Sequence, residues 1–231
     1  MGIVRQSLQR RTLTVHTLCN GLYKQNCYIV ANAEKKECIV IDPGGEPDFL
    51  TENIVALGFR VVHILLTHGH FDHLGACNAL TKIFDLPCLV HAADKKLVRQ
   101  AGTYAFRFAR QKLMPLMHTS YFEKCDAFAW SGGNIRTIHT PGHTAGSVSY
   151  FFQDDSIFSG DTLFLEHIGP DYYPESDSAA LFASINLILS ILPEDGMIFS
   201  GHGKPWQARD AKLWWQNYSA NPPRFQLFGA K

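Results

Sequence analysis

The chain has 231 residues, 46% of them hydrophobic, and its 21 lysine and arginine residues balance 21 aspartate and glutamate residues. This composition predicts a globular chain with a packed core, and the zero net charge argues against nucleic acid or an anionic membrane as a partner. No apolar run is long enough to span a bilayer, and none follows the basic N-terminus as in a secretory signal. The six cysteines form no CxxC pair, so we expect a cytoplasmic protein.

In the first half of the chain, short β-rich runs alternate with patterns of helical spacing. The expected strands are residues 12–18, 26–32, 37–45, 61–67 and 87–92, and the expected helices are 47–58 and 74–84. Residues 94–122 form a helical or irregular segment, and the role of 94–130 does not follow from the sequence. Within it, residues 103–113 (TYAFRFARQKL) alternate phenylalanine with arginine, which suits either a helix packed on a sheet or a cover over a pocket.

The second half returns to strands. The expected elements are strands at 134–140, 147–153, 156–160 and 196–201, and helices at 178–192 and 208–217. No internal repeat, low-complexity linker or shift in composition divides the chain. We therefore expect one domain over residues 1–231, with a short C-terminal helix and tail.

Side chains that can bind a metal are concentrated in THGHFDH, directly behind the apolar run 61–66. A lone histidine in such a place is usually a buried structural residue, as we expect for His63, but His68, His70, Asp72 and His73 lie within six residues. In an extended segment, side chains two positions apart point to the same side. His68 and His70 can thus converge on one point, while Asp72 and His73 reach a second point nearby.

Three further motifs supply ligand-type residues later in the chain. TPGHTAGS contains His143, FSGDTLF contains Asp161 and FSGHGKP contains His202, each beside glycine at the end of an apolar run. Glycine lets the backbone turn sharply, and divalent metals accept imidazole together with carboxylate. Because a carboxylate has two oxygens, Asp161 can bridge two metals.

The series THGHFDH, PGHTAGS, SGDTLF and SGHG, in this order, resembles the metallo-β-lactamase-fold hydrolases, and most of all their glyoxalase II (hydroxyacylglutathione hydrolase) branch. The resemblance implies an α+β fold, the four-layer αββα sandwich, with the metal site at the edge between two β-sheets. It also implies two divalent metal ions, with zinc favoured and iron or manganese as alternatives. The implied ligands are His68, His70 and His143 for one metal, Asp72, His73 and His202 for the other, and Asp161 as the bridge.

Such a site predicts hydrolysis of a small thioester or related acyl substrate by a metal-bound hydroxide. Asp72 is the expected catalytic residue, because it can orient the nucleophile or move a proton while it binds metal. Thr144 and Thr162 each follow a ligand and are candidate hydrogen-bond donors. Candidate substrate-binding residues lie in the segment after GDTLF: His167, Tyr172 and Tyr173.

Two departures from the glyoxalase II pattern leave the substrate open. Pro170 stands where relatives have the arginine of a glycine-arginine turn, and the chain from His202 to residue 231 is too short for the helical tail that brings basic residues to glutathione. The alternatives are a mononuclear iron oxidoreductase similar to persulfide dioxygenases, and a lactonase. A scaffold without activity is the weakest reading, because no ligand position is missing.

Overall fold

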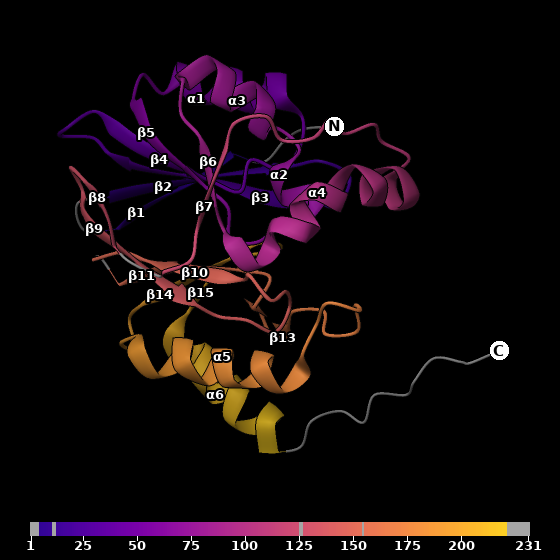
Figure 1. The fold of residues 1–231 in the computed structure, drawn as a ribbon. Coiled ribbons are helices and arrows are strands. Elements are labelled where there is room, and N and C mark those ends of the chain that lie inside the picture. The colour runs from indigo at the N-terminus through magenta and orange to yellow at the C-terminus, as the bar shows by residue number, and fades with distance from the viewer. Residues whose placement is uncertain (1–4, 11–12, 125–126, 154, 221–231) are drawn as a thin grey trace.

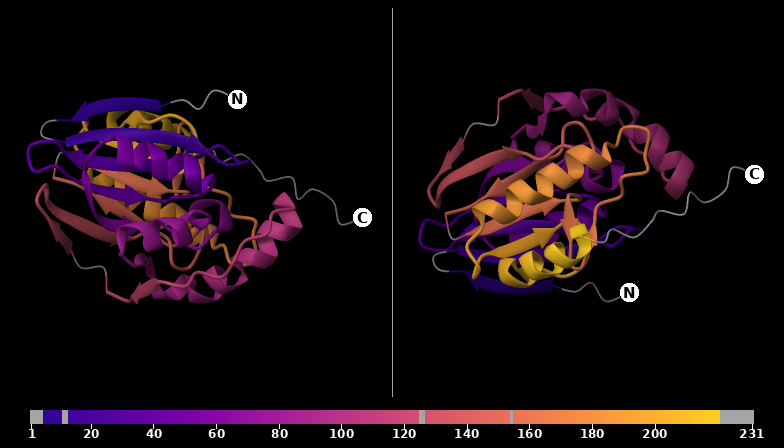
Figure 2. Two further views of the ribbon diagram at one scale, coloured as in Figure 1. Left: turned by 90° about the horizontal axis from the view of Figure 1, so that it is seen from above. Right: turned by 90° about the horizontal axis from the view of Figure 1, so that it is seen from below.

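The structure is a computed structural model that describes residues 5–10, 13–124, 127–153 and 155–220. It has four layers: α1 (Pro47–Ala56) and α3 (Cys77–Phe84) cover one β-sheet, a second sheet packs against the first, and α5 (Ser178–Ile191) and α6 (Ala208–Ala220) cover the far side (Figures 1 and 2). The predicted αββα sandwich is therefore confirmed. No helix in these ranges is long and apolar enough to cross a membrane.

The first sheet is mixed, with antiparallel pairs from β1 to β4 and parallel pairs from β4 to β7. Its strands, in spatial order, are β1 (Arg5–Arg10), β2 (Leu13–Asn20), β3 (Gln25–Asn32), β4 (Glu37–Ile41), β5 (Arg60–Leu65), β6 (Cys88–His91) and β7 (Thr119–Phe122). Between β5 and β6 lie α2 (Phe71–Leu74) and α3. After β6, the turn η1 (Ala92–Asp94) leads into α4 (Lys95–Tyr104) and a π-helical turn, η2 (Ala105–Ala109).

The second sheet has the order β15-β14-β11-β10-β9-β8, in which only β11 and β14 pair in parallel. Its strands are β8 (Ala127–Trp130), β9 (Gly133–His139), β10 (Val148–Phe151), β11 (Ser156–Gly160), β14 (Met197–Ser200) and β15 (Trp206–Gln207). A small hairpin of β12 (Leu163–Phe164) and β13 (His167–Ile168) follows β11.

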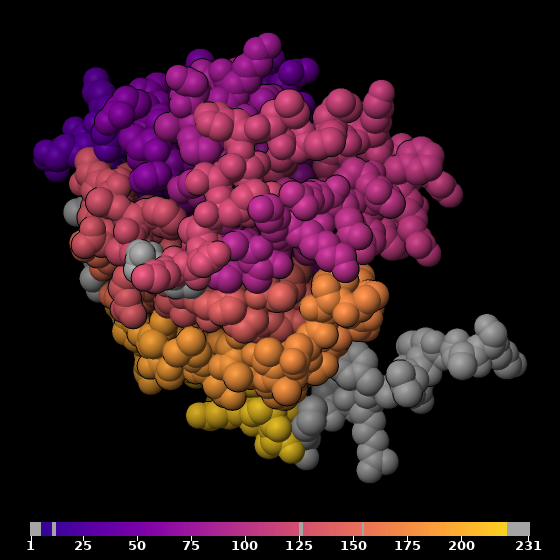
Figure 3. Space-filling model, viewed as in Figure 1, coloured from indigo at the N-terminus to yellow at the C-terminus, as the bar shows by residue number. Residues whose placement is uncertain are grey.

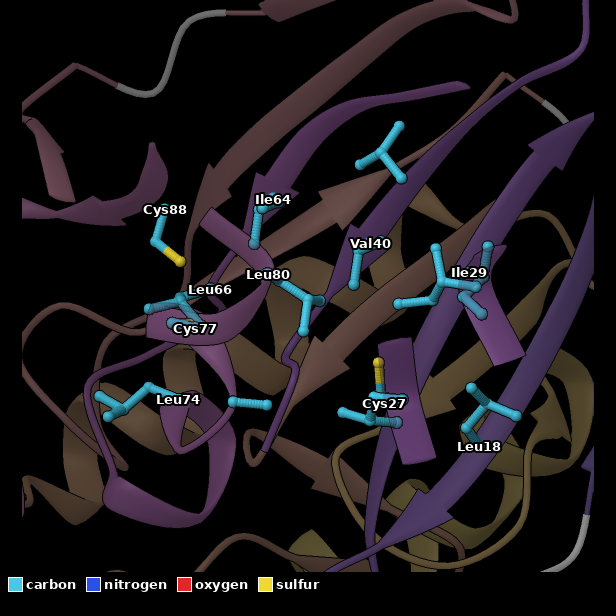
Figure 4. Packing of buried hydrophobic residues seen from close by; sticks show 14 of the residues in the cluster. Leu18, Cys27, Ile29, Val40, Ile64, Leu66, Leu74, Cys77, Leu80 and Cys88 are labelled. Atoms are coloured by element: carbon cyan, nitrogen blue, oxygen red, sulfur yellow. The ribbon is translucent and has the colours of Figure 1, made fainter. Parts of the chain in front are cut away.

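Three apolar cores hold the layers together. Strand β4 lies between two of them, and after Glu37 all of its residues are apolar. Cys38 and Val40 point into the core under α1 and α3, whereas Ile39 and Ile41 point into the core between the sheets. Because successive side chains of a strand face opposite sides, a strand buried on both faces needs apolar residues at every position. Figure 4 shows Val40 in the first of these cores, near Leu80 of α3. The third core lies under α5 and α6.

The structure differs from the predicted elements in a few places. Strands β1, β7, β8, β12, β13 and β15 were not predicted; β1 (RQSLQR) is polar and pairs along β2 at the edge of its sheet. The strand expected over 37–45 ends at Ile41, because Asp42 has a left-handed φ of 51° and Pro43 follows. The helix expected over 74–84 begins only at Cys77. The predicted tail lies outside the described residues, and the single domain over 1–231 stays a prediction.

Candidate metal centre

Four chain segments that leave the ends of strands converge at one edge of the sandwich. THGHFDH follows β5, and the segments with His143, Asp161 and His202 follow β9, β11 and β14. Strands β11 and β14 are parallel neighbours, so Asp161 and His202 follow their ends side by side. The residues just before them are joined by a hydrogen bond of 2.8 Å from Gly201 N to Gly160 O. The C-terminal ends of adjacent parallel strands are where α/β sheets usually place ligands.

Three histidines form the first donor set. The Nδ1 atom of His70 lies 3.0 Å from Nε2 of His68 and 2.9 Å from Nε2 of His143. His68 and His143 are buried, and His70 is half-buried. The structure thus brings together the residues that the resemblance assigned to one metal.

The second donor set lies beside the first. His73 Nε2 is 3.3 Å from His202 Nε2, and Asp72 Oδ2 is 3.4 Å from His202 Nε2. Asp161 lies between the sets, with Oδ1 3.4 Å from His73 Nε2 and Oδ2 3.7 Å from His143 Nε2. Its buried Oδ1 has no hydrogen-bond partner among the described residues. A buried carboxylate oxygen in this position fits a divalent cation.

All five histidines use their other ring nitrogen to contact the surrounding protein. These contacts are His68 Nδ1 to Thr67 Oγ1 (3.0 Å), His70 Nε2 to Glu175 Oε1 (3.1 Å), His73 Nδ1 to Asp42 Oδ2 (3.0 Å), His143 Nδ1 to Pro170 O (2.8 Å) and His202 Nδ1 to Tyr23 O (3.0 Å). A neutral imidazole has a single N–H, so donating it outward leaves the inward nitrogen as a lone pair. Lone pairs and carboxylates converging without a cation would repel one another, so the residues fit metal ions.

The two donor sets differ in their electrostatics. Burial lowers the pKa of His143 to about 4 and places that of His68 well below its usual value, so these rings stay neutral. Burial also opposes the charged form of His73 and His202, but carboxylates, Asp161 foremost, raise the pKa of both rings. The second set therefore attracts positive charge, whether it is carried by protons or by a metal.

Asp42 is a supporting residue to which the sequence analysis assigned no role. It is buried at the end of β4, where its carboxylate accepts hydrogen bonds from Thr67 N (2.7 Å), Thr67 Oγ1 (2.6 Å) and His73 Nδ1. Strands β4 and β5 are parallel neighbours, which places Asp42 next to the start of THGHFDH. An acidic residue directly after the apolar run CIVI, in IDPGG, was the signal that could have indicated it.

Asp94 is a second missed residue, and no local signal marks it. Its buried carboxylate accepts hydrogen bonds from Gly69 N (2.8 Å), Gly146 N (2.7 Å) and Thr144 Oγ1 (2.8 Å). Asp94 thus ties the loop of His68 and His70 to the loop of His143. Thr144 is a hydrogen-bond donor as expected, whereas buried Thr162 Oγ1 has no partner among the described atoms.

The candidate substrate-binding residues occupy different surroundings. The ring of Tyr173 lies 5.5 Å from that of His70, and Tyr172, 70% exposed, packs against Tyr173 at 4.8 Å. His167 is exposed on β13. The same segment contains Glu175, which the sequence analysis did not single out. Substrate binding by these residues stays a prediction.

The site opens to solvent on the side of the second donor set. The side chains of Asp72 and His202 are 20% and 25% exposed, whereas His73 is fully buried. Gly201 permits the close approach of the ligands, since a Cβ there would lie 2.0 Å from Asp161 Oδ1. His63 lies away from this edge: it is half-buried rather than buried as expected, and its Nε2 contacts Ala129 O at 3.1 Å.

Comparison with known proteins agrees with this geometry. The family model described as "Metallo-beta-lactamase superfamily" matches residues 20–202. A hydroxyacylglutathione hydrolase, GloC, of Haemophilus influenzae is 33% identical over 184 residues, which are 78% of this chain and 86% of that protein. Two solved structures are similar as well. The BLEG-1 B3 metallo-beta-lactamase has a TM-score of 0.78 at 30% identity, covering 89% of this chain and 97% of that one. TTHA1623 in a di-iron-bound form has a TM-score of 0.76 at 31% identity, covering 85% and 96%.

Proposed function

The chain belongs to the metallo-beta-lactamase superfamily, and from that premise we propose that it is a dinuclear metal-dependent hydrolase of a small thioester or related acyl substrate. One observation carries the proposal: two complete donor sets lie side by side and share the carboxylate of Asp161. The similarity to a hydroxyacylglutathione hydrolase supports the thioester as substrate. Hydrolysis of a thioester breaks its C–S bond, forms a C–O bond with water and releases a carboxylic acid and a thiol.

His68, His70 and His143 would hold one cation, and Asp72, His73 and His202 the other, with Asp161 between them. Imidazole with carboxylate suits zinc and also iron or manganese. When bound, the cations activate water and polarise the acyl carbonyl.

Two side chains, one beside each donor set, would act in proton transfer and hydrogen bonding. Burial acts to raise the pKa of Asp72, but His73 and His202 outweigh it and lower that pKa, so Asp72 stays a carboxylate that can accept a proton from water. Burial raises the pKa of Tyr173, so its phenol keeps its proton and can donate a hydrogen bond to the substrate.

The alternatives predict different uses of the site. A mononuclear iron oxidoreductase needs only part of these ligands and would not use the second donor set. The presence of that second set favours the dinuclear hydrolase. A lactonase would use the same two metals and differ only in the substrate.

The first test is metal content per chain by elemental analysis, on protein expressed without added metal, combined with turnover of S-lactoylglutathione and a lactone panel. We expect about two metal ions per chain and thioester hydrolysis that stops when the metals are chelated. A single iron with oxygen consumption and no hydrolysis would replace the proposal with the oxidoreductase. Turnover of lactones alone would replace the thioester.

A further inference from the structure

A cavity of about 370 Å³ lies beside the second donor set. Its lining includes Asp72 and Tyr23, and the carbonyl of Tyr23 accepts the hydrogen bond from His202 Nδ1. The cavity therefore adjoins the proposed metal ligands and extends away from them, between the β2–β3 turn, residues 44–47, α2 and the segment 105–113. Its volume lies in the range of pockets that bind small molecules.

The segment 105–113 forms one wall of this cavity. It continues α4 in the magenta and pink arm that projects to the right in Figures 1 and 3. Arg110 has a left-handed φ of 55°, and Gln111 N donates to Ala105 O at 3.1 Å, so the chain turns back after η2 and places Lys112 on the cavity. Tyr23 Oη donates to Phe108 O at 3.2 Å, which fastens this wall to the opposite one.

The charged side chains of the cavity lining differ in whether they already have an interaction partner. Glu46 accepts a hydrogen bond from Gly21 N (2.9 Å), and Asp72 belongs to the second donor set. Lys112 is exposed, and in the parts of the chain that the structure describes its ammonium has no ion pair or hydrogen bond. Between these groups the lining mixes apolar side chains (Leu22, Phe71 and Leu113) with polar ones (Asn20, Gln25 and Gln111). The cavity thus extends from the metal site to a lysine whose ammonium has no partner among the described residues.

We propose that this cavity binds the non-reacting arm of the substrate, and that Lys112 recognises a carboxylate on that arm. The inference rests on the hydrolase proposed above and narrows its substrate to a thioester of a carboxylate-bearing thiol. Apolar side chains combined with a small number of polar or charged groups are the usual way in which a pocket orients a small ligand.

The kinetic test compares the metal-loaded wild type with Lys112→Gln and Lys112→Glu. The substrates are S-lactoylglutathione, whose thiol arm carries carboxylates, and the lactoyl thioester of N-acetylcysteamine, whose arm is neutral. We expect KM for the glutathione thioester to rise about threefold in Lys112→Gln and about tenfold in Lys112→Glu, since the first change removes one solvent-exposed ion pair and charge reversal adds repulsion. The kcat and all constants for the neutral thioester should stay unchanged.

The matched control is Lys82→Glu, which makes the same charge change on α3, where Lys82 is exposed and outside the cavity lining. It should leave both substrates unaffected. Equal losses on both substrates in the Lys112 variants, or no change on either, would overturn the inference.

A binding measurement separates this inference from the proposed function. S-methylglutathione is a thioether that cannot be hydrolysed, and its affinity can be measured by calorimetry without turnover. If the wild type binds it and Lys112→Glu loses that binding although no thioester is hydrolysed, the hydrolase proposal fails and the cavity assignment stands. If thioesters are hydrolysed but the Lys112 variants bind S-methylglutathione as the wild type does, the cavity assignment fails alone.

Discussion

Each histidine among the proposed metal ligands is oriented by a residue outside the ligand set. The partners are of different kinds: a hydroxyl for His68, carboxylates for His70 and His73, and backbone carbonyls for His143 and His202. Such partners select the ring nitrogen that faces the metal and fix the plane of the ring. The partner of His70 is Glu175, from a segment that departs from the glyoxalase II pattern.

Replacing Glu175 therefore tests whether the partner of His70 supports the first metal position. Glu175→Ala removes the acceptor of the His70 Nε2–H, so we expect metal affinity at this position to fall about 10- to 100-fold. Glu175→Gln keeps an oxygen acceptor without the charge and should lose less. Competition with a zinc chelator measures both. Glu52→Ala, exposed on α1, is the control, and equal affinities in all four proteins would contradict the expectation.

Asp161→Ala tests the bridging role. This carboxylate approaches ligands of both sets, so its loss should remove the second metal and weaken the first, leaving less than about half of the wild-type metal. Elemental analysis gives the metal content, and Asp48→Ala on the exposed start of α1 is the control. A variant with full metal content and full turnover would exclude Asp161 as the bridge.

Among the secondary-structure elements, the start of α4 connects loops that come from different sheets. Asp94 precedes α4, and its carboxylate accepts from the loop after β5 and from the loop between β9 and β10. A carboxylate accepts several hydrogen bonds, whereas the nitrogen of an asparagine amide accepts none. The loops that carry the first donor set therefore depend on the two acceptor oxygens of one buried side chain.

Asp94→Asn should destabilise the metal-free protein by about 3 kcal/mol, because buried N–H donors lose their acceptor. Urea unfolding measures this free energy, and using metal-free protein keeps metal loss out of the comparison. Asp210→Asn, exposed in the first turn of α6, should change the unfolding midpoint little. An Asp94→Asn midpoint equal to that of the wild type would show that the loops are held by other contacts.

For the whole molecule, the donor sets join the two halves of the sandwich. His68, His70, Asp72 and His73 follow the first sheet, whereas His143, Asp161 and His202 follow strands of the second. Any ion bound here connects both sheets in the native state, and the unfolded chain lacks this arrangement. Metal binding should therefore stabilise folding as well as supply chemistry.

Removing the metals should lower the melting temperature by about 10 °C, since a ligand present at about a thousand times its Kd stabilises by about 4 kcal/mol. Thermal unfolding with and without a chelator measures the shift. Asp161→Ala, which is expected to hold little metal, should respond much less. If chelation removed the wild-type metal without changing the melting temperature, the ions would not connect the halves as described.

The sequence by itself determined the ligand types and the strands buried on both faces. Both depend on neighbours within a few residues: THGHFDH contains its own spacing, and a strand such as β4 is apolar at nearly every position because both of its faces are buried. The edge strand β1 was not predicted, because backbone pairing with β2 holds it in place and such pairing does not require particular side-chain types.

Only the tertiary structure decided which residues support the site. Asp42 and His73 are 31 positions apart, and His70 and Glu175 are 105 apart. Likewise, Lys112 lies on the cavity through a turn within a segment whose role the sequence left undefined. The physical reason is that a polar side chain looks alike in the sequence whether it faces water or a buried partner, and the packing of distant elements selects between them.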